Sequence, residues 1–248
     1  MSDDIVLSNE YLEAVEKYLE ERGKPVCLKT GFRTLDGLVG GMEGGEVWII
    51  SGTPKAGKTL LLKTFLRNLS EQEVMCCVFQ YEVNPYKFLK SMENPSGSIP
   101  IFALPTTIKD HDLKWLDTMI SKAIKKYKAQ VIFIDHLHFL VDLMRHNISI
   151  EIGSVMRRLK KMALTHNVVI FLVAHTVKAK PDTELDMSDI RDSGLIAAES
   201  DTILFIWRTK KPHNGSVLKI AADRKNGTIT KIELVKTGLY LEEVKSHA

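Results

Sequence analysis

The chain has 248 residues, of which 44% are hydrophobic, so it can form one large domain, or one domain with an appendage, around an ample core. Its 34 basic and 31 acidic side chains leave a net charge of +3, too small an excess to indicate nucleic-acid binding by itself. Cys76 and Cys77 are adjacent in an expected strand and point to opposite faces, which argues against a disulfide framework. The longest apolar run, Val168 to Ala174, is far shorter than the ~20 residues of a membrane span. We therefore expect a soluble, cytoplasmic protein with no membrane partner.

The first expected element is an amphipathic helix over residues 9–22, followed by Gly23 as a stop and by Lys24-Pro25, which is typical of an extended linker. Its apolar positions recur at helical spacing and are Tyr11, Leu12, Val15, Tyr18 and Leu19. Such a helix can pack on its own domain or on a neighbouring subunit, and the pattern favours neither. We divide the chain accordingly into an N-terminal linker helix, residues 1–24, and a main domain, residues 25–248.

The central motif follows an apolar strand at residues 47–50. Gly52, Gly57, Lys58 and Thr59 fit the pattern G-x-x-x-x-G-K-[ST], and an amphipathic helix then continues to residue 69. The glycines allow backbone N–H groups to curl around an anion, and the helix N-terminus adds partial positive charge at the same place. Lys58 can reach the outer phosphates of a nucleotide and Thr59 can hold Mg²⁺. The sequence therefore predicts a phosphate-binding loop.

Three further apolar strands are expected to end in polar residues, at the sheet edge where open α/β sheets bind ligands. Glu82 is a candidate base for activating water, or else an ordinary exposed glutamate. Asp135 is the expected carboxylate that organises Mg²⁺. His175 is either a sensor of the γ-phosphate or a structural histidine. The three strands are expected at residues 74–79, 131–134 and 168–174.

Apolar periodicity predicts the remaining elements. Helices are expected at 86–92, 112–128 and around 152–163, with a short strand at 101–104 and loops at 136–149 and 178–194. Strands at 201–207, 217–222, 229–235 and 239–244, joined by short turns, are expected to extend the sheet partly as antiparallel hairpins.

The order of these motifs resembles the RecA-type motor domain of the DnaB-like replicative helicases, and is similar also to phage and mitochondrial primase-helicase motors. The resemblance runs from about Thr30 to Leu241. It begins with T-G-F-x-x-L-D before a Gly-Gly turn, and its most specific parts are IDHLHFL and DIRDSGLIAAESD, which resemble the family's I-D-Y-L-Q-L and D-L-R-E-S-G-x-I-E-x-D-A-D. It implies an α/β fold with a RecA-like P-loop NTPase core, in which a mainly parallel sheet is flanked by helices and carries antiparallel C-terminal strands.

The same resemblance implies roles for individual residues. Glu82 would be the catalytic base, Lys58 would contact the β- and γ-phosphates, Thr59 and Asp135 would hold Mg²⁺, and His175 would report the state of the γ-phosphate. The ATP-binding residues would be Gly52, Thr53, Pro54, Lys55, Ala56, Gly57, Lys58, Thr59 and Leu60. Candidates for contact with single-stranded DNA, in loops facing the channel of a ring, are Arg145, Lys178, Lys180 and Arg191. The N-terminal helix would dock on the adjacent subunit.

The sequence departs from the family pattern in three places. The late K-x-R-N-G motif, whose arginine reaches into the neighbouring ATP site, is replaced by residues 223–227, DRKNG, so that Arg224 is the candidate finger and Lys225 a weaker substitute. In a strand this one-residue shift reverses the side-chain face unless a bulge restores it. His138 replaces the family's glutamine, and the N-terminal domain of the helicases is not present in this sequence.

These features together lead to an expected function. The resemblance implies an ATP-dependent DNA helicase or single-strand translocase of bacterial or phage type, assembled as a homo-oligomer, either a hexameric ring or a helical filament, with a primase or loader as a further partner. One alternative is a RecA-family recombination or annealing mediator that does not unwind DNA. Another is a nucleotide-gated loader subunit that serves a separate helicase or primase.

Overall fold

The computed structural model describes residues 7–8, 12–13, 17, 27–141, 148–176, 184–190, 193–209 and 214–244. The strands are β1 (Val47–Gly52), β2 (Cys76–Gln80), β3 (Val131–Asp135), β4 (Val169–His175), β5 (Thr202–Arg208), β6 (Gly215–Asp223), β7 (Thr230–Thr237) and β8 (Tyr240–Glu243). The helices are α2 (Arg33–Val39), α3 (Lys58–Glu71), α4 (Pro85–Lys90), α5 (Leu113–Tyr127), α6 (Ile148–His166) and α7 (Ser193–Glu199), with short 3₁₀ turns η1 (Leu137–Phe139) and η2 (Met187–Asp189).

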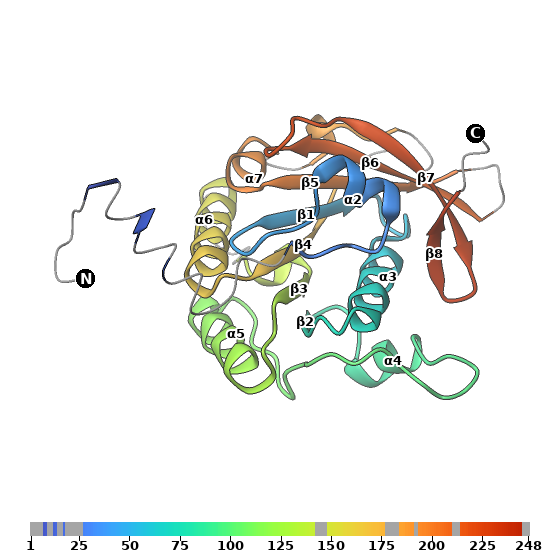
Figure 1. The fold of residues 1–248 in the computed structure, drawn as a ribbon, viewed down its shortest axis with the longest axis horizontal. Coiled ribbons are helices and arrows are strands. Elements are labelled where there is room, and N and C mark those ends of the chain that lie inside the picture. The colour runs from blue at the N-terminus through green and yellow to red at the C-terminus, as the bar shows by residue number, and fades with distance from the viewer. Residues whose placement is uncertain are drawn as a thin grey trace.

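All eight strands form one sheet in the order β2-β3-β4-β1-β5-β6-β7-β8. The first five strands of this order are parallel to one another, whereas β6, β7 and β8 are joined as antiparallel neighbours. Helices α5, α6 and α7 cover one face of the sheet, and α2, α3 and α4 cover the other (Figure 1). The expected α/β fold, with a mainly parallel sheet and antiparallel C-terminal strands, is confirmed.

Strand β1 lies between β4 and β5, and all six of its residues are buried. On one face of the sheet, an aromatic cluster packs α3, the helix that follows the loop after β1, against the strands. Phe171 is the centre of this cluster, with its ring centroid 4.8 Å from that of Phe133, 5.5 Å from Trp48 and 5.3 Å from Phe65 of α3. Buried aromatic pairs of this kind contribute hydrophobic area and specific ring contacts. Strand β1 and helix α3, which flank the loop, therefore pack against the same aromatic residue of β4.

The two adjacent cysteines lie on opposite faces, as expected. Cys76 belongs to the core beneath α3 and Cys77 to the core beneath α5 and α6, and both are free thiols. Within the described part of the chain, no helix combines the length and apolar character needed to cross a membrane. Most of the expected N-terminal helix lies outside the described residues; Ser8, Leu12, Glu13 and Lys17 are described and helical. The division at residue 24 therefore stays a prediction.

Three local expectations were wrong. The strand expected at 101–104 is a single bridge between Ala103 and Cys77. Two short helices were missed: α2 lies in the stretch of the T-G-F-x-x-L-D motif, for which no element was expected, and α7 begins inside the expected loop. Each has seven residues, too few to show a helical apolar period. Tertiary packing stabilises both helices, because Leu35 of α2 and Ile196 of α7 are buried in the two cores.

The T-G-F-x-x-L-D motif has a structural explanation. Asp36, in the first turn of α2, accepts hydrogen bonds from the backbone N–H of Thr30 at 2.7 Å, the Thr30 hydroxyl at 2.9 Å and the N–H of Gly31 at 3.1 Å. The Thr30 carbonyl in turn accepts from the Asn68 amide of α3 at 3.0 Å. The motif thus ties the chain entering the domain to the helix that follows the phosphate-binding loop.

Replacing Asp36 by alanine is expected to lower the free energy of unfolding by about 2–3 kcal/mol, because the N–H of the fully buried Thr30 loses its acceptor. Denaturant unfolding followed by circular dichroism measures the change. Thr34→Ala, on the exposed side of the same helix, is the control and should leave stability within about 0.5 kcal/mol. Equal effects of the two substitutions would contradict the proposed role of Asp36.

Candidate nucleotide site

The loop between β1 and α3 has the backbone that the motif predicts. Gly52 needs to be glycine because a Cβ there would lie 2.4 Å from the carbonyl oxygen of Ile206 in β5. Gly57 has a φ of 112°, in the left-handed region that favours glycine, and α3 begins at the next residue. The loop therefore ends at the N-terminus of a 14-residue helix, where backbone N–H groups and the helix dipole favour a phosphate.

Lys58 is the buried cation of this loop. Its side chain is 6% exposed, and its Nζ donates to the carbonyl oxygens of Gly52 at 2.7 Å and Thr53 at 2.9 Å. Burial lowers the pKa of Lys58 to about 8, and the nearby carboxylates of Asp135 and Glu82 oppose this shift. The lysine thus lies close to both acidic residues that the sequence predicted for the site.

Asp135, at the end of β3, provides the oxygen ligands expected for a hard cation. The Thr59 hydroxyl lies 3.5 Å from its Oδ2, and the Gln80 amide donates to the same oxygen at 3.0 Å. Its Oδ1 is buried and has no hydrogen-bond partner among the described residues, and burial raises the pKa of the carboxyl group. A hydroxyl and a carboxylate oxygen with free coordinating capacity fit Mg²⁺, which prefers such oxygen ligands and retains several waters.

Gln80 connects the two acidic residues, and the sequence alone gave no reason to select it. The oxygen of its side-chain amide accepts hydrogen bonds from the backbone N–H of Glu82 at 2.9 Å and of Val83 at 3.2 Å, while the nitrogen of the same amide donates to Asp135. Gln80 and Asp135 are paired directly across β2 and β3. Gln80 therefore holds the turn that carries the exposed Glu82 beside the carboxylate of the next strand.

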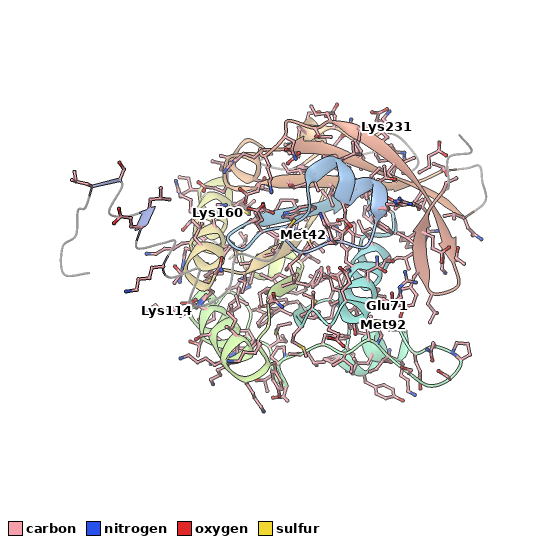
Figure 2. The ribbon with its side chains drawn as sticks, viewed as in Figure 1. Met42, Glu71, Met92, Lys114, Lys160 and Lys231 are labelled. Atoms are coloured by element: carbon pink, nitrogen blue, oxygen red, sulfur yellow. The ribbon has the colours of Figure 1, made fainter. Side chains whose placement is uncertain are left out.

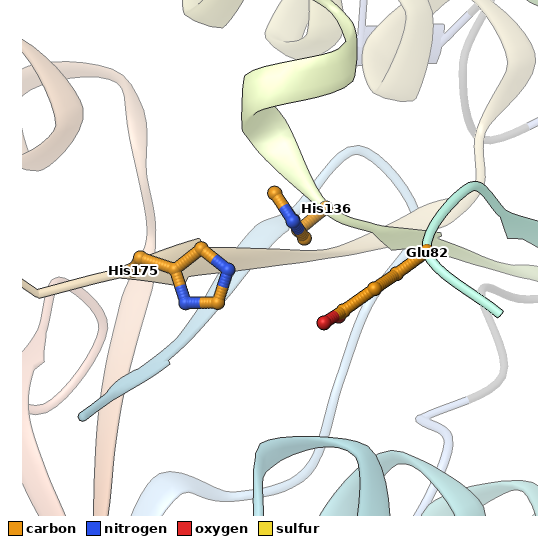
Figure 3. Close-up of side chains that lie close together, drawn as sticks. All are labelled: Glu82, His136 and His175. Atoms are coloured by element: carbon orange, nitrogen blue, oxygen red, sulfur yellow. The ribbon is translucent and has the colours of Figure 1, made fainter. Parts of the chain in front are cut away.

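Two histidines complete this edge of the sheet (Figure 3). His175 ends β4, as predicted, and His136 follows Asp135; their ring centroids are 4.2 Å apart. Burial lowers the pKa of both imidazoles to about 4, and the Lys58 cation acts in the same direction. Both rings are therefore neutral near pH 7. His136 was missed because only its two neighbours in the motif, Asp135 and His138, drew attention in the sequence.

A pocket beside the loop provides space next to the phosphate-binding backbone. It lies between the start of α3 and the ends of the strands β5, β6 and β7, and it carries two basic side chains, Arg208 and Lys236. The residues that line it are Ala56, Gly57, Leu60, Arg208, Thr209, Asn214, Gly215, Ser216 and Lys236. Of these, the sequence predicted only the loop residues, because no local pattern shows which ends of the antiparallel strands β6 and β7 lie beside the loop.

Arg224 lies at the opposite edge of the sheet from its own phosphate-binding loop. Asp223, at the end of β6, pairs with Thr202 at the start of β5, which is parallel to Trp48 near the start of β1. The loop instead follows the end of β1. Arg224 therefore cannot serve the site of its own chain. Arg224 occupies a turn at residues 224–226 rather than a strand. The alternation of side chains between strand faces therefore does not determine where its side chain points.

The contacts of Arg224 are those of a half-exposed side chain. Its guanidinium donates to the carbonyl oxygen of Ala198 at 2.7 Å and lies 3.6 Å from the carboxylate of Asp201. Asp201 also forms a shorter ion pair, at 2.7 Å, with Lys160 of α6, which is labelled in Figure 2. Lys225 is paired with Glu43. Arg224 thus makes only a long ion pair within its own chain.

The four candidates for DNA contact, Arg145, Lys178, Lys180 and Arg191, lie outside the described residues. Their roles stay predictions. Lys58, Thr59, Glu82, Asp135 and His175, by contrast, are all brought together at one edge of the sheet.

Comparisons with a family model and with known relatives point to the same protein family. A family model described as the DnaB-like helicase C terminal domain matches residues 27–113 and 97–242. The replicative DNA helicase DnaB of Treponema pallidum is 22% identical over 256 residues, covering 90% of this chain and 57% of that protein. The DnaB of Mycoplasma pneumoniae is 28% identical over 247 residues, covering 84% of this chain and 52% of that protein. The chain thus spans about half the length of these relatives.

Solved structures agree with the fold. The ATPase domain of G40P aligns with a TM-score of 0.81 at 18% identity, covering 98% of this chain and all of that domain. A DnaB-like replicative helicase, whose structure was determined together with its interactions with primase, aligns with a TM-score of 0.78 at 17% identity, covering 98% of this chain and 68% of that one.

Proposed function

Because the chain belongs to the DnaB-like helicase C-terminal domain family, we propose that it is an ATP-hydrolysing motor that translocates on single-stranded DNA and unwinds duplex DNA. The observation that carries this proposal is the convergence of Lys58, Asp135, Glu82 and His175 on one edge of the sheet, beside a phosphate-binding loop at a helix N-terminus. This arrangement has a cation for the phosphates, oxygen ligands for a metal ion and a base for water.

In the proposed mechanism, the residues Gly52 to Leu60 bind ATP and the neighbouring pocket accepts its nucleoside. Lys58 exchanges the loop carbonyls for the outer phosphates. Thr59 and Asp135 would hold Mg²⁺, which would supply charge neutralisation at those phosphates. Glu82 orients water for in-line attack, and Gln80 fixes the backbone of the turn that carries it. His175, which is neutral, senses the γ-phosphate and couples its loss to the loop that follows β4.

The remaining parts of the motor require a second copy of the chain. Since Arg224 lies on the far edge from its own loop, each complete site combines the loop of one subunit with Arg224 of the next. Head-to-tail contacts of this kind form a ring, such as a hexamer, when they close and a helical filament when they do not. Residues 1–24 act as the linker to the neighbour, and residues 25–248 are the motor. Arg145, Lys178, Lys180 and Arg191 bind single-stranded DNA, and a primase or loader is the further partner of this cytoplasmic protein.

The direct test is steady-state ATP hydrolysis by the full chain with and without single-stranded DNA, followed by unwinding of a forked duplex. We expect DNA to stimulate hydrolysis, unwinding to require ATP, and both to weaken steeply as salt rises. Lys58→Ala should abolish both activities.

Other outcomes would redirect the assignment. Annealing or strand exchange without unwinding would favour a recombination mediator. Tight ATP binding with negligible turnover, whether DNA is present or not, would favour a loader subunit and would contradict an autonomous helicase.

A further inference from the structure

Glu82, His136 and His175 converge from three neighbouring strands. Glu82 follows β2, His136 follows β3 and His175 ends β4, and these strands are adjacent in the sheet. Figure 3 shows the Glu82 carboxylate directed towards the space beside the two imidazole rings. One ligand atom of each side chain lies within 4.8 Å of the other two. Backbone positions fixed by three paired strands therefore bring two nitrogens and one oxygen together.

We propose that these three side chains bind a divalent transition-metal ion of the Zn²⁺ class. Tetrahedral Zn²⁺ has bonds of about 2.0–2.1 Å to nitrogen and oxygen, which places its ligand atoms roughly 3.3 Å from one another. The present separations of up to 4.8 Å exceed that value, so the proposal requires the side chains to draw together when the ion binds. Two imidazoles and one carboxylate are also a common set of protein ligands for catalytic zinc, with one position left open.

The environment of the histidines supports a ligand at this place. His136 is 8% exposed, and its Nδ1 and that of His175 are buried without a hydrogen-bond partner among the described residues. Buried polar atoms without a partner are costly, and a bound ion removes that cost. The Lys58 ammonium opposes positive charge at the two rings, whereas the carboxylate of Glu82 favours it at His175. Glu82 is therefore the ligand that supplies the negative charge a cation needs here.

This site differs from the proposed magnesium site in its chemistry. Thr59 and Asp135 offer oxygen only, which suits Mg²⁺, whereas the imidazole nitrogens of His136 and His175 select a softer metal. The two sites are nevertheless close, because His136 directly follows Asp135 in sequence. A metal bound to Glu82 also occupies the proposed catalytic base, so Zn²⁺ should inhibit ATP hydrolysis. That consequence rests on the proposed function, whereas metal binding itself does not.

The experiment uses the untagged, nucleotide-free full chain carrying Cys27→Ser, which removes the exposed thiol, in millimolar Mg²⁺. Co²⁺ is titrated and followed by its visible absorption, and Zn²⁺ is then added to displace it. We expect one ion per chain with a tetrahedral spectrum. His136→Ala, His175→Ala and Glu82→Gln should each weaken binding at least tenfold, and His111→Ala, an exposed histidine outside the cluster, should not.

The results separate the two proposals. Glu82 is exposed, so Glu82→Gln tests the site even if a histidine variant fails to fold. Absence of Co²⁺ binding by the folded parent chain, or binding unchanged in the folded cluster variants, would overturn the metal site. Co²⁺ binding that the cluster variants weaken, in a chain that does not hydrolyse ATP, would support the metal site while contradicting the motor.

Discussion

Replacing Glu82 by glutamine is expected to lower kcat for ATP hydrolysis by about 10²–10⁴-fold, the range that general-base catalysis contributes. Glutamine has nearly the shape of glutamate but cannot accept the proton of the attacking water. The side chain is exposed, and the backbone N–H of Glu82 donates one hydrogen bond to the side-chain oxygen of Gln80, which the substitution retains. The loss should therefore appear in kcat, with little change in stability or in ATP affinity.

Single-turnover hydrolysis and equilibrium binding of a fluorescent ATP analogue separate these effects. Glu93→Gln is the matched control. Glu93 follows α4, the helix that begins shortly after Glu82, and it forms an exposed ion pair with Lys90. It should leave kcat within about twofold, since such pairs contribute little. A Glu82→Gln variant with normal kcat would show that the base lies elsewhere, and a variant that loses ATP binding would point to a role in affinity instead.

The parts of this site that the sequence predicted are those governed by local patterns. The loop at Gly52–Thr59 follows from residue types at fixed spacing, because few other sequences place glycines and a lysine between a strand and a helix. Asp135 and His175 follow from a second rule: parallel strands end at the same edge, so polar residues at strand ends meet there. Both rules use one segment at a time, and the structure confirms the convergence that they predicted.

The parts that were missed depend on how segments pair. Gln80 matters because it lies opposite Asp135 in the register of β2 and β3, and register is a property of two strands together. His136 matters because β4 is inserted between β1 and β3, which brings His175 to its side. The position of Arg224 likewise depends on the antiparallel pairing of β5 and β6. No periodicity within one segment contains this information.

Replacing Arg224 by alanine is expected to lower kcat of the assembled protein by about 10³–10⁵-fold, the contribution of an arginine finger to phosphoryl transfer. The domain itself should stay folded, because the Arg224 side chain is 52% exposed and its ion pair with Asp201 is a long one of 3.6 Å. Hydrolysis with DNA present measures the loss, and thermal unfolding checks the fold. Lys225→Ala is the matched control, since the neighbouring Lys225 is paired with Glu43 of its own chain.

Mixing subunits distinguishes action in trans from a structural role. Lys58→Ala and Arg224→Ala chains are each inactive alone, yet a mixed assembly contains interfaces that join an intact loop to an intact Arg224. With random head-to-tail assembly of equal amounts, about one interface in four is of this kind, so roughly a quarter of full activity should return. Arg224 acting within its own chain would allow no recovery, because every chain then lacks one essential group. If Lys225→Ala, rather than Arg224→Ala, is inactive and is rescued by mixing, the finger is Lys225, and the one-residue shift in DRKNG has preserved the position while changing the residue.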